Sequence, residues 1–201
     1  MIVKKTVLLG LSGGVDSAVS ALLLKKQGFN VIGLFMQTFR EESRSKNPCK
    51  SKSSMTDEKM AKIIAKMLKI KFIPKDYKKE YYKKVIMPMI KDYQKGLTPN
   101  PDIVCNKLIK FPYLLEEAKR LGADYIATGH YARIKKTKFG FQLLQGKDIA
   151  KDQSYFLYDL DQKTLSKTLF PIGNLKKEEV RKIAERHNFP NWDKPGTAGI
   201  C

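Results

Sequence analysis

The fold of this chain is decided by the stretch Thr6-Val7-Leu8-Leu9-Gly10-Leu11-Ser12-Gly13-Gly14-Val15-Asp16-Ser17. Its first half belongs to a short apolar run over 4–10, which is typical of a buried parallel strand. Its glycine-rich second half leads into apolar residues at helical spacing from Asp16 to Gln27. A strand joined to a helix through glycines aims the unpaired N–H groups of the helix at an anion. The sequence therefore predicts a phosphate site directly after the first strand.

Strand and helix patterns continue to alternate along the chain. Strands are expected over 30–36, 72–74 and 125–128, helices after Thr56 and over 77–94 (kinked or broken at Pro88), 105–121 and 176–187, and a hairpin over 131–135 and 141–144. This alternation predicts an α/β fold, a doubly wound and mostly parallel sheet with helices on both faces, plus a small hairpin and C-terminal helices. We expect a single domain over 1–201, with a core over 1–135 and a hairpin and helical extension over 136–201.

Composition excludes several classes of protein. The 201 residues carry 39 Lys and Arg against 20 Asp and Glu, a formal charge of +19, and 42% of them are hydrophobic. That hydrophobic share is too high for a disordered basic tail. No apolar run approaches the roughly 18 residues that span a bilayer, so neither a membrane protein nor a secretory signal is expected. The expectation is a cytoplasmic globular protein that attracts polyanions such as RNA, although Lys outnumbers Arg and part of the charge is simply solvated surface.

The three cysteines are Cys49, Cys105 and Cys201. They are widely spaced, with no CxxC pair and no Cys/His cluster of zinc spacing, so no structural metal is expected. In a cytosolic protein these cysteines should be thiols. Such a thiol is either a small buried side chain that packs in the core or a reactive group that takes part in chemistry.

The glycine-rich loop has its own chemistry. It lacks the Gly-Lys-Ser/Thr ending of a Walker loop and the GxGxxG of a dinucleotide site. The hydroxyls of Ser12 and Ser17 can donate to phosphate, and Asp16 can hold Mg²⁺ beside it. The segment Ser-Gly-Gly-Val-Asp-Ser over 12–17 resembles the loop of the PP-loop ATP pyrophosphatases. That resemblance implies cleavage of ATP between its α and β phosphates, with an adenylate left on the substrate and pyrophosphate released.

Other segments narrow the resemblance. They are Gly33-Leu34-Phe35-Met36, Thr98-Pro99-Asn100-Pro101-Asp102-Ile103-Val104-Cys105-Asn106, Ala127-Thr128-Gly129-His130-Tyr131, Lys151-Asp152-Gln153-Ser154-Tyr155-Phe156-Leu157 and Gly199-Ile200-Cys201. Together, and in this order, they resemble the tRNA-specific 2-thiouridylase family. The resemblance implies ATP-dependent 2-thiolation of a wobble uridine, with ATP and Mg²⁺ as cofactors. It implies tRNA and a persulfide donor, either a cysteine desulfurase or a relay protein, as partners.

The resemblance also implies residue roles. Cys201 would carry the persulfide, Cys105 would be its catalytic partner and would form a disulfide with it, and Asp102 would be the acid/base residue. The implied ATP contacts are Gly10, Leu11, Ser12, Gly13, Gly14, Val15, Asp16, Ser17, Met36 and Gly129. The implied tRNA contacts are Asn100, Pro101 and Asp102 at the target base, and His130, Lys151, Asp152 and Gln153 elsewhere. We expect Cys105 at a helix start, where the helix dipole would favour a thiolate. Cys49 has no assigned role.

The chain departs from the family in two places. Before Cys201, Thr197 stands where the family has Ser, and Gly196 supplies no carboxylate. Members of the family continue into a central domain and a β-barrel, which we expect to be absent here, so the chain is either a fragment or a minimal enzyme. Two other interpretations stay open at this stage: another PP-loop adenylating enzyme, or a truncated tRNA-binding remnant without catalysis.

Overall fold

A computed structural model describes residues 4–38 and 56–194. Its main sheet has the order β3-β2-β1-β4-β7, and every neighbouring pair of strands in it is parallel. The strands are β1 (Thr6–Gly10), β2 (Asn30–Gln37), β3 (Lys71–Asp76), β4 (Tyr125–Ala127) and β7 (Thr168–Leu169). The central position of β1 and the parallel register confirm the predicted doubly wound α/β fold. The two-residue strand β7 at the edge was not predicted, because two residues show no periodicity.

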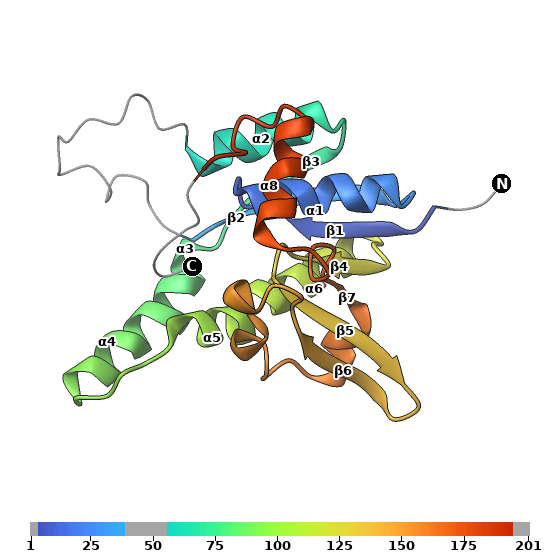
Figure 1. Ribbon diagram of the computed structural model, residues 1–201. Coiled ribbons are helices and arrows are strands. Elements are labelled where there is room, and N and C mark those ends of the chain that lie inside the picture. The colour runs from blue at the N-terminus through green and yellow to red at the C-terminus, as the bar shows by residue number, and fades with distance from the viewer. Residues whose placement is uncertain (1–3, 39–55, 195–201) are drawn as a thin grey trace.

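Helices cover both faces of this sheet (Figure 1). Successive side chains of β1 point to opposite faces of the sheet. Val7 and Leu9 pack with α1 (Val15–Lys26), α2 (Asp57–Met67) and α8 (Lys177–Arg186). Leu8 packs on the other face with α6 (Phe111–Leu121). These three side chains of β1 are all 0% exposed. Burying one such aliphatic side chain contributes about 1.5–3 kcal/mol, so the apolar run of β1 anchors both layers at once. The loop that follows β1 is therefore held on a rigid strand.

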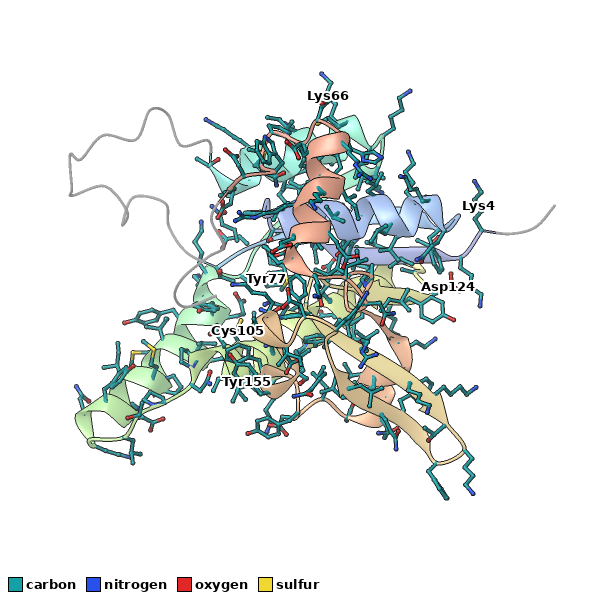
Figure 2. All side chains as sticks on the ribbon, in the orientation of Figure 1. Lys4, Lys66, Tyr77, Cys105, Asp124 and Tyr155 are labelled. Carbon is teal, nitrogen blue, oxygen red and sulfur yellow. The ribbon has the colours of Figure 1, made fainter. Side chains whose placement is uncertain are left out.

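A long helical arm leaves the carboxyl end of β3 (Figures 1 and 2). It comprises α3 (Lys78–Tyr81), a π-helical turn at Tyr82–Ile86 and α4 (Met87–Gln94), and the chain returns through α5 (Pro101–Cys105) and a second π-helical turn, Asn106–Lys110, into α6. Each π-helical turn ends two residues before a proline, Pro88 or Pro112. Proline lacks an N–H and its ring crowds the preceding turn, so the backbone widens there. This is the predicted irregularity at Pro88.

The start of the returning helix was predicted wrongly. The helix begins at Pro101, not at Cys105. The side-chain oxygen of Asn100 accepts hydrogen bonds from the backbone N–H groups of Asp102 (3.2 Å) and Ile103 (3.3 Å), while Pro101 stands at the first helical position. An Asn cap followed by proline is a strong start signal. The predicted start at Cys105 is therefore four residues too late, because the helix is capped at Asn100.

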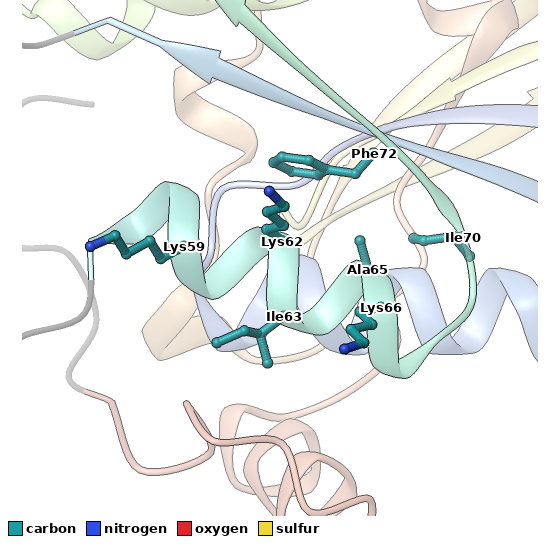
Figure 3. A pocket seen from close by; sticks show the side chains of 7 residues that line it. All are labelled: Lys59, Lys62, Ile63, Ala65, Lys66, Ile70 and Phe72. Carbon is teal, nitrogen blue, oxygen red and sulfur yellow. The ribbon is translucent and has the colours of Figure 1, made fainter.

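A surface pocket lies at the β3 edge of the sheet (Figure 3). It is lined by Lys59, Lys62, Ile63, Ala65, Lys66, Ile70 and Phe72. On α2, Met60 and Ile64 are buried, whereas Met67 is 43% exposed. None of the lining residues is one of the residues predicted to bind ATP or tRNA. The pocket is therefore separate from the site described below.

The remainder of the described chain packs against the same core. The hairpin consists of β5 (Ala132–Thr137) and β6 (Gly140–Gln145), which pair in antiparallel register. Two short 3₁₀ turns, Ile149–Lys151 and Ser154–Phe156, and α7 (Gln162–Lys167) follow. The expected boundary between 135 and 136 falls inside β5, and α8 packs on α1. Across 4–38 and 56–194, no helix is long and apolar enough to cross a membrane.

Candidate active site

The glycine-rich loop forms an anion-binding turn between β1 and α1. Gly13 has φ +79°, a left-handed conformation that favours glycine, and Gly14 precedes α1 without a side-chain cap. The hydroxyl of Ser17 donates to the carbonyl of Gly14 (3.0 Å) and accepts from the backbone N–H of Ser12 (3.2 Å). These bonds shape the turn. Gly14, at the N-cap position, makes no side-chain hydrogen bond to the first N–H groups of α1. A phosphate is the natural acceptor for such groups.

Residues from two neighbouring strands meet this loop at the carboxyl edge of the sheet. Gly129 follows β4, and a Cβ there would lie 2.9 Å from both the carbonyl carbon of Asp16 and the backbone nitrogen of Ser17. Met36, near the end of β2, packs both on the cluster of Leu8 and on that of Cys105. Because helices α1 and α6 lie on opposite faces beside β1, this is the switch point at which open α/β sheets bind ligands. The structure thus brings the predicted ATP-binding residues together.

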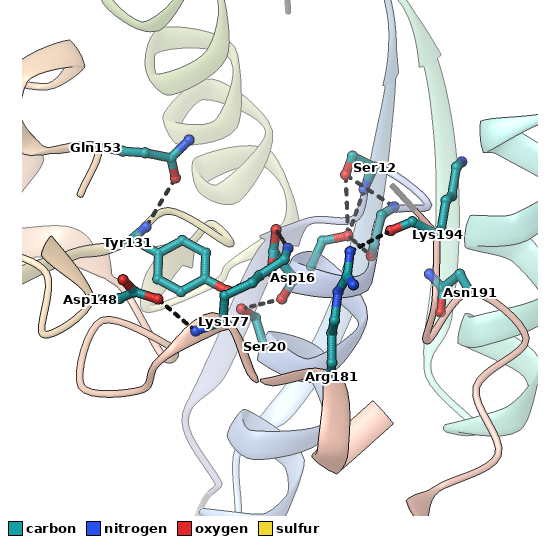
Figure 4. Close-up of polar contacts among 12 residues, drawn as sticks. Ser12, Asp16, Ser20, Tyr131, Asp148, Gln153, Lys177, Arg181, Asn191 and Lys194 are labelled. Carbon is teal, nitrogen blue, oxygen red and sulfur yellow. Dashed lines mark hydrogen bonds and ion pairs between the residues drawn. The ribbon is translucent and has the colours of Figure 1, made fainter. Parts of the chain in front are cut away.

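Asp16 is tied to residues distant in sequence (Figure 4). Its two carboxylate oxygens each lie 2.7 Å from Nζ of Lys177, and its Oδ1 also accepts from the hydroxyl of Tyr131 at 2.8 Å. Burial first, and then the charge of Asp16, raise the pKa of Tyr131 far above its ordinary value. Tyr131 is therefore a permanent hydrogen-bond donor at neutral pH.

A magnesium site built from protein carboxylates does not fit this arrangement. Both oxygens of Asp16 are engaged by an ammonium group, and the part of the chain that the structure describes contains no group of three or more Cys, His, Asp or Glu able to hold a metal ion. Mg²⁺ commonly binds through substrate phosphates and water with few protein ligands. A magnesium role for Asp16 stays a prediction that requires displacement of Lys177.

Asp102 and Cys105 share one short helix. They lie three residues apart on α5, a spacing that places side chains on the same side of a helix. Cys105 is the last residue of α5 and 2% exposed, packed with Tyr81, Val85 and Ile109 (Figure 2). The expected activation of its thiol by a helix N-terminus is therefore wrong, because that N-terminus is at Pro101. Cys49, Thr197 and Cys201 lie outside the described residues.

Some residues predicted to contact tRNA are exposed, and others form hydrogen bonds within the protein. Asn100 and Lys151 are exposed, and Pro101 and Asp102 are half-buried. Asp152 accepts from the backbone N–H of Gly146 (2.8 Å) and the hydroxyl of Ser154 (2.7 Å). Although burial raises its pKa, these hydrogen bonds outweigh that effect and lower it. Asp152 therefore shapes its own loop.

Gln153 connects this loop to the phosphate site. Its side-chain oxygen accepts from the backbone N–H of Tyr131 at 3.1 Å, and its own backbone N–H donates to the carbonyl of Tyr131 at 2.9 Å. The hydroxyl of the same Tyr131 reaches Asp16. A rigid series of contacts therefore links the loop around Gln153 to the first turn of α1.

His130 is buried against two aromatic rings. It is 8% exposed, its Nδ1 lies 2.6 Å from the hydroxyl oxygen of Thr128, and its ring contacts those of Phe111 and Phe170. Burial, and then the charge of Lys110, hold the pKa of His130 well below its usual range. In this conformation His130 is neutral and supports the turn after β4. A direct contact with tRNA stays a prediction.

This burial predicts an acid-sensitive stability. Below a pH of about 6.5 the unfolded chain protonates His130 while the folded chain does not, so the free energy of unfolding falls as the pH falls, by up to about 1.4 kcal/mol per pH unit. Urea unfolding between pH 7 and 5 measures this slope, and His130→Gln should flatten it. His187→Gln, the same change at the other histidine, should keep the slope because His130 is intact. An unchanged slope in His130→Gln would contradict the assignment.

Three residues of the site had no role predicted from the sequence. Lys177 and Arg181 come from α8, and their short-range pattern is that of any basic amphipathic helix. Tyr131 stood in a quoted segment without a role. Two basic side chains four residues apart on a helix do not indicate a partner in α1. Only tertiary packing therefore places Lys177 and Arg181 in the site.

The sequence of this chain is similar to those of known proteins. A family model described as the tRNA methyl transferase HUP domain matches residues 5–201. A tRNA-specific 2-thiouridylase MnmA from Nitrosomonas europaea is 50% identical over 198 residues, which cover 98% of this chain and 54% of the relative. A second relative of that name, MnmA 2 from Aliarcobacter butzleri, is 49% identical over 197 residues, covering 98% of this chain and 53% of the relative. The chain spans about half the length of the curated relatives it matches.

Solved structures agree on the fold. A predicted subunit of tRNA methyltransferase from Methanocaldococcus jannaschii has a TM-score of 0.55 at 17% identity, covering 90% of this chain and 76% of that one. An NMN synthetase from Francisella tularensis has a TM-score of 0.56 at 18% identity, covering 98% of this chain and 68% of that one. The resemblance to the 2-thiouridylases is confirmed at the level of sequence. Because the family match begins at residue 5 and runs to residue 201, the chain belongs to the tRNA methyl transferase HUP domain family.

Proposed function

We propose that this chain catalyses ATP-dependent 2-thiolation of the wobble uridine of tRNA. The observation that carries the proposal is the uncapped N-terminus of α1 behind the left-handed Gly13, at the carboxyl edge of the sheet. The 2-thiouridylase names of relatives about half identical to the chain supply the substrate class. A net charge of +19 favours binding to the RNA backbone.

The first step proposed is adenylation. The C2 oxygen of the uridine attacks the α phosphorus of ATP, the bond to the β phosphate breaks, and pyrophosphate leaves. The hydroxyl of Ser12 and the N–H groups of α1, including that of Ser17, hold the phosphates. The hydroxyl of Ser17 shapes the loop through its bonds to Gly14 and Ser12, and Gly129 lets the turn after β4 approach closely. The step converts a poor leaving group at C2 into AMP.

The second step transfers sulfur. The terminal sulfur of a persulfide on Cys201 attacks C2, AMP leaves with the former carbonyl oxygen, and the thiol of Cys105 then attacks the remaining sulfur–sulfur bond. The products are the 2-thiouridine, AMP, and a disulfide between the two cysteines in place of the persulfide of Cys201 and the thiol of Cys105. Alternatively, Cys105 attacks the persulfide first and releases sulfide beside the activated carbon. Both routes consume one persulfide and form one disulfide.

Cys105 and Asp102 carry defined roles in this proposal. Asp102 exchanges the proton of the base, and Asn100 and Pro101 hold the base at the start of α5. Cys105 is 2% exposed, so binding of the base has to uncover its thiol. A cysteine desulfurase or a relay protein supplies the persulfide. Magnesium enters only as the ion that ATP carries on its phosphates, and the reaction takes place in the cytoplasm.

Mass spectrometry of tRNA nucleosides tests the proposal. The purified chain is incubated with unmodified tRNA, ATP and a persulfide donor. We expect 2-thiouridine at the wobble position, dependent on ATP, with AMP and pyrophosphate released. A different adenylated or methylated nucleoside would assign another reaction, and tRNA binding without any product would assign a binding protein. Either result would overturn the proposed function.

A further inference from the structure

The face of α8 that meets the glycine-rich loop carries two cations (Figure 4). Val180 and Ala184 of this helix are both 0% exposed and pack with α1. Lys177 and Arg181 are four residues apart and therefore lie on one side of α8. The backbone N–H of Lys177 donates to Oδ2 of Asp148 at 2.8 Å, which fixes the start of the helix. The helix thus holds two basic side chains beside the first turn of α1.

Lys177 retains a donor after pairing with Asp16. Its side chain is 15% exposed and Nζ is 2.7 Å from each carboxylate oxygen of Asp16. An ammonium group has three N–H donors, so two are directed at Asp16 and one remains. The pair also cancels the negative charge of Asp16, which would otherwise repel a phosphate at the start of α1. Lys177 therefore can bind a phosphate oxygen without releasing Asp16.

Arg181 supplies a second, independent observation. Its Nε is buried and has no hydrogen-bond partner among residues 4–38 and 56–194, and its Nη2 reaches only the carbonyl of Lys194, at 3.5 Å. A buried donor without an acceptor costs about 1–3 kcal/mol, so an acceptor is expected beside it. Figure 4 shows Arg181 and Lys177 of α8 beside the first turn of α1, where Asp16 lies.

The segment after α8 is fastened to the loop itself. Asn191, which is 1% exposed, donates from Nδ2 to the carbonyl of Gly13 at 2.9 Å. Lys194 pairs with Asp57 of α2 at 2.5 Å. These contacts hold the segment after α8 against the loop and α2, while the hydrogen bond from Lys177 to Asp148 fixes the start of the helix. The two cations are thus pre-organised, which limits the entropy lost when a ligand binds.

We propose that Lys177 and Arg181 bind the pyrophosphate portion of ATP and hold it as the leaving group. This inference rests on the proposed function, and it adds a binding surface from α8 to the loop of 10–17. Lys177 donates to a phosphate oxygen directly while it bridges to Asp16, and Arg181 donates to the adjoining oxygens from its unused N–H groups. The developing negative charge on pyrophosphate is then neutralised by protein cations.

Titration calorimetry with inorganic pyrophosphate in EDTA tests the proposal. Lys177→Met should weaken pyrophosphate binding by about 10- to 100-fold, the loss expected for a charge-assisted contact, and leave adenosine binding unchanged. Lys182→Met is the matched control, because it removes the same charge from an exposed position of α8. Equal pyrophosphate affinities in Lys177→Met and Lys182→Met would overturn the inference.

A double-mutant cycle separates direct contact from an effect through Asp16. In an Asp16→Asn background, Lys177→Met should still weaken pyrophosphate binding about tenfold if Lys177 touches phosphate. No further loss in that background would reduce Lys177 to a positioning residue for Asp16 and overturn the proposal. Arg181→Gln leaves the Asp16 pair intact and should also weaken binding about tenfold, which keeps the test decisive if Lys177→Met unfolds.

Failure of this inference can be told from failure of the proposed function. If the unaltered chain forms 2-thiouridine and binds pyrophosphate, but Lys177→Met and Arg181→Gln bind it equally well, only the role of α8 is wrong. If the unaltered chain binds pyrophosphate through these residues but forms no 2-thiouridine, the phosphate site stands and the thiolation proposal fails. If it does not bind pyrophosphate at all, the inference fails whatever the nucleoside analysis shows.

Discussion

Cys105→Ser is expected to abolish 2-thiouridine formation, with a loss of more than about a thousandfold. Serine nearly matches the size of cysteine, so the packing of this 2% exposed side chain with Tyr81, Val85 and Ile109 should survive. Its hydroxyl cannot break a persulfide or an S–S adduct. ATP cleavage does not involve the thiol, so release of pyrophosphate in the presence of tRNA should continue. Nucleoside mass spectrometry and a pyrophosphate assay measure the two steps on the same samples.

The matched control is Cys49→Ser, which removes a thiol to which we assign no role. It should leave thiolation unchanged. Retention of full thiolation in Cys105→Ser would remove Cys105 from the mechanism and favour another PP-loop adenylating enzyme. Loss of pyrophosphate release together with thiolation, in a variant that melts normally, would also contradict the assigned role, because it would place Cys105 in the adenylation step.

Gly13→Ala should destabilise the fold by at least about 3 kcal/mol and eliminate ATP binding. Gly13 has φ +79°, and a Cβ at this position would lie 2.2 Å from the carbonyl oxygen of Asp57. The neighbouring atom belongs to the backbone at the start of α2, so it cannot rotate away. Relief requires the loop or α2 to move, which would also disturb the contact of Asn191 with the Gly13 carbonyl. Urea unfolding and ATP titration measure both effects.

The adjacent glycine is the control for this prediction. Gly14 has φ −80°, and a Cβ there would meet only the hydroxyl oxygen of Ser12, at 3.5 Å. Gly14→Ala keeps the backbone N–H groups of the loop and should cost only about 1 kcal/mol, the difference between glycine and alanine before a helix. Equal stability of the two alanine variants would show that the conformation of Gly13 is not required.

Much of the fold followed from local patterns. The apolar run before Gly10 and the helical spacing after Asp16 predicted β1 and α1, and the later strands and helices followed from periodicity in the same way. Element boundaries were less certain where two signals competed. Asn100 and Pro101 are common in turns as well as at helix starts. Here they cap and begin α5, because the apolar positions that follow continue into one long helical segment.

The positions of some predicted site residues followed from the sequence, but the exposure of others did not. The loop of 10–17, Met36 and Gly129 meet at one edge because parallel strands end there together. The exposure of His130, Asp152 and Gln153 could not be predicted, because it depends on Phe111, Phe170, Gly146 and Tyr131 packing around them. A polar residue near a strand end shows the same local pattern whether it faces solvent or supports the turn.

The amino-acid sequence by itself determined the strand–glycine–helix unit, the α/β class and the family, since these depend on short-range conformational preferences and on motif order. The tertiary structure alone decided that Asp16 pairs with Lys177, at a separation of 161 residues, and that Arg181 lies beside the same turn. The physical reason is that an ion pair depends on which helix faces pack together, and α8 meets α1 only once both have buried their apolar sides on one core.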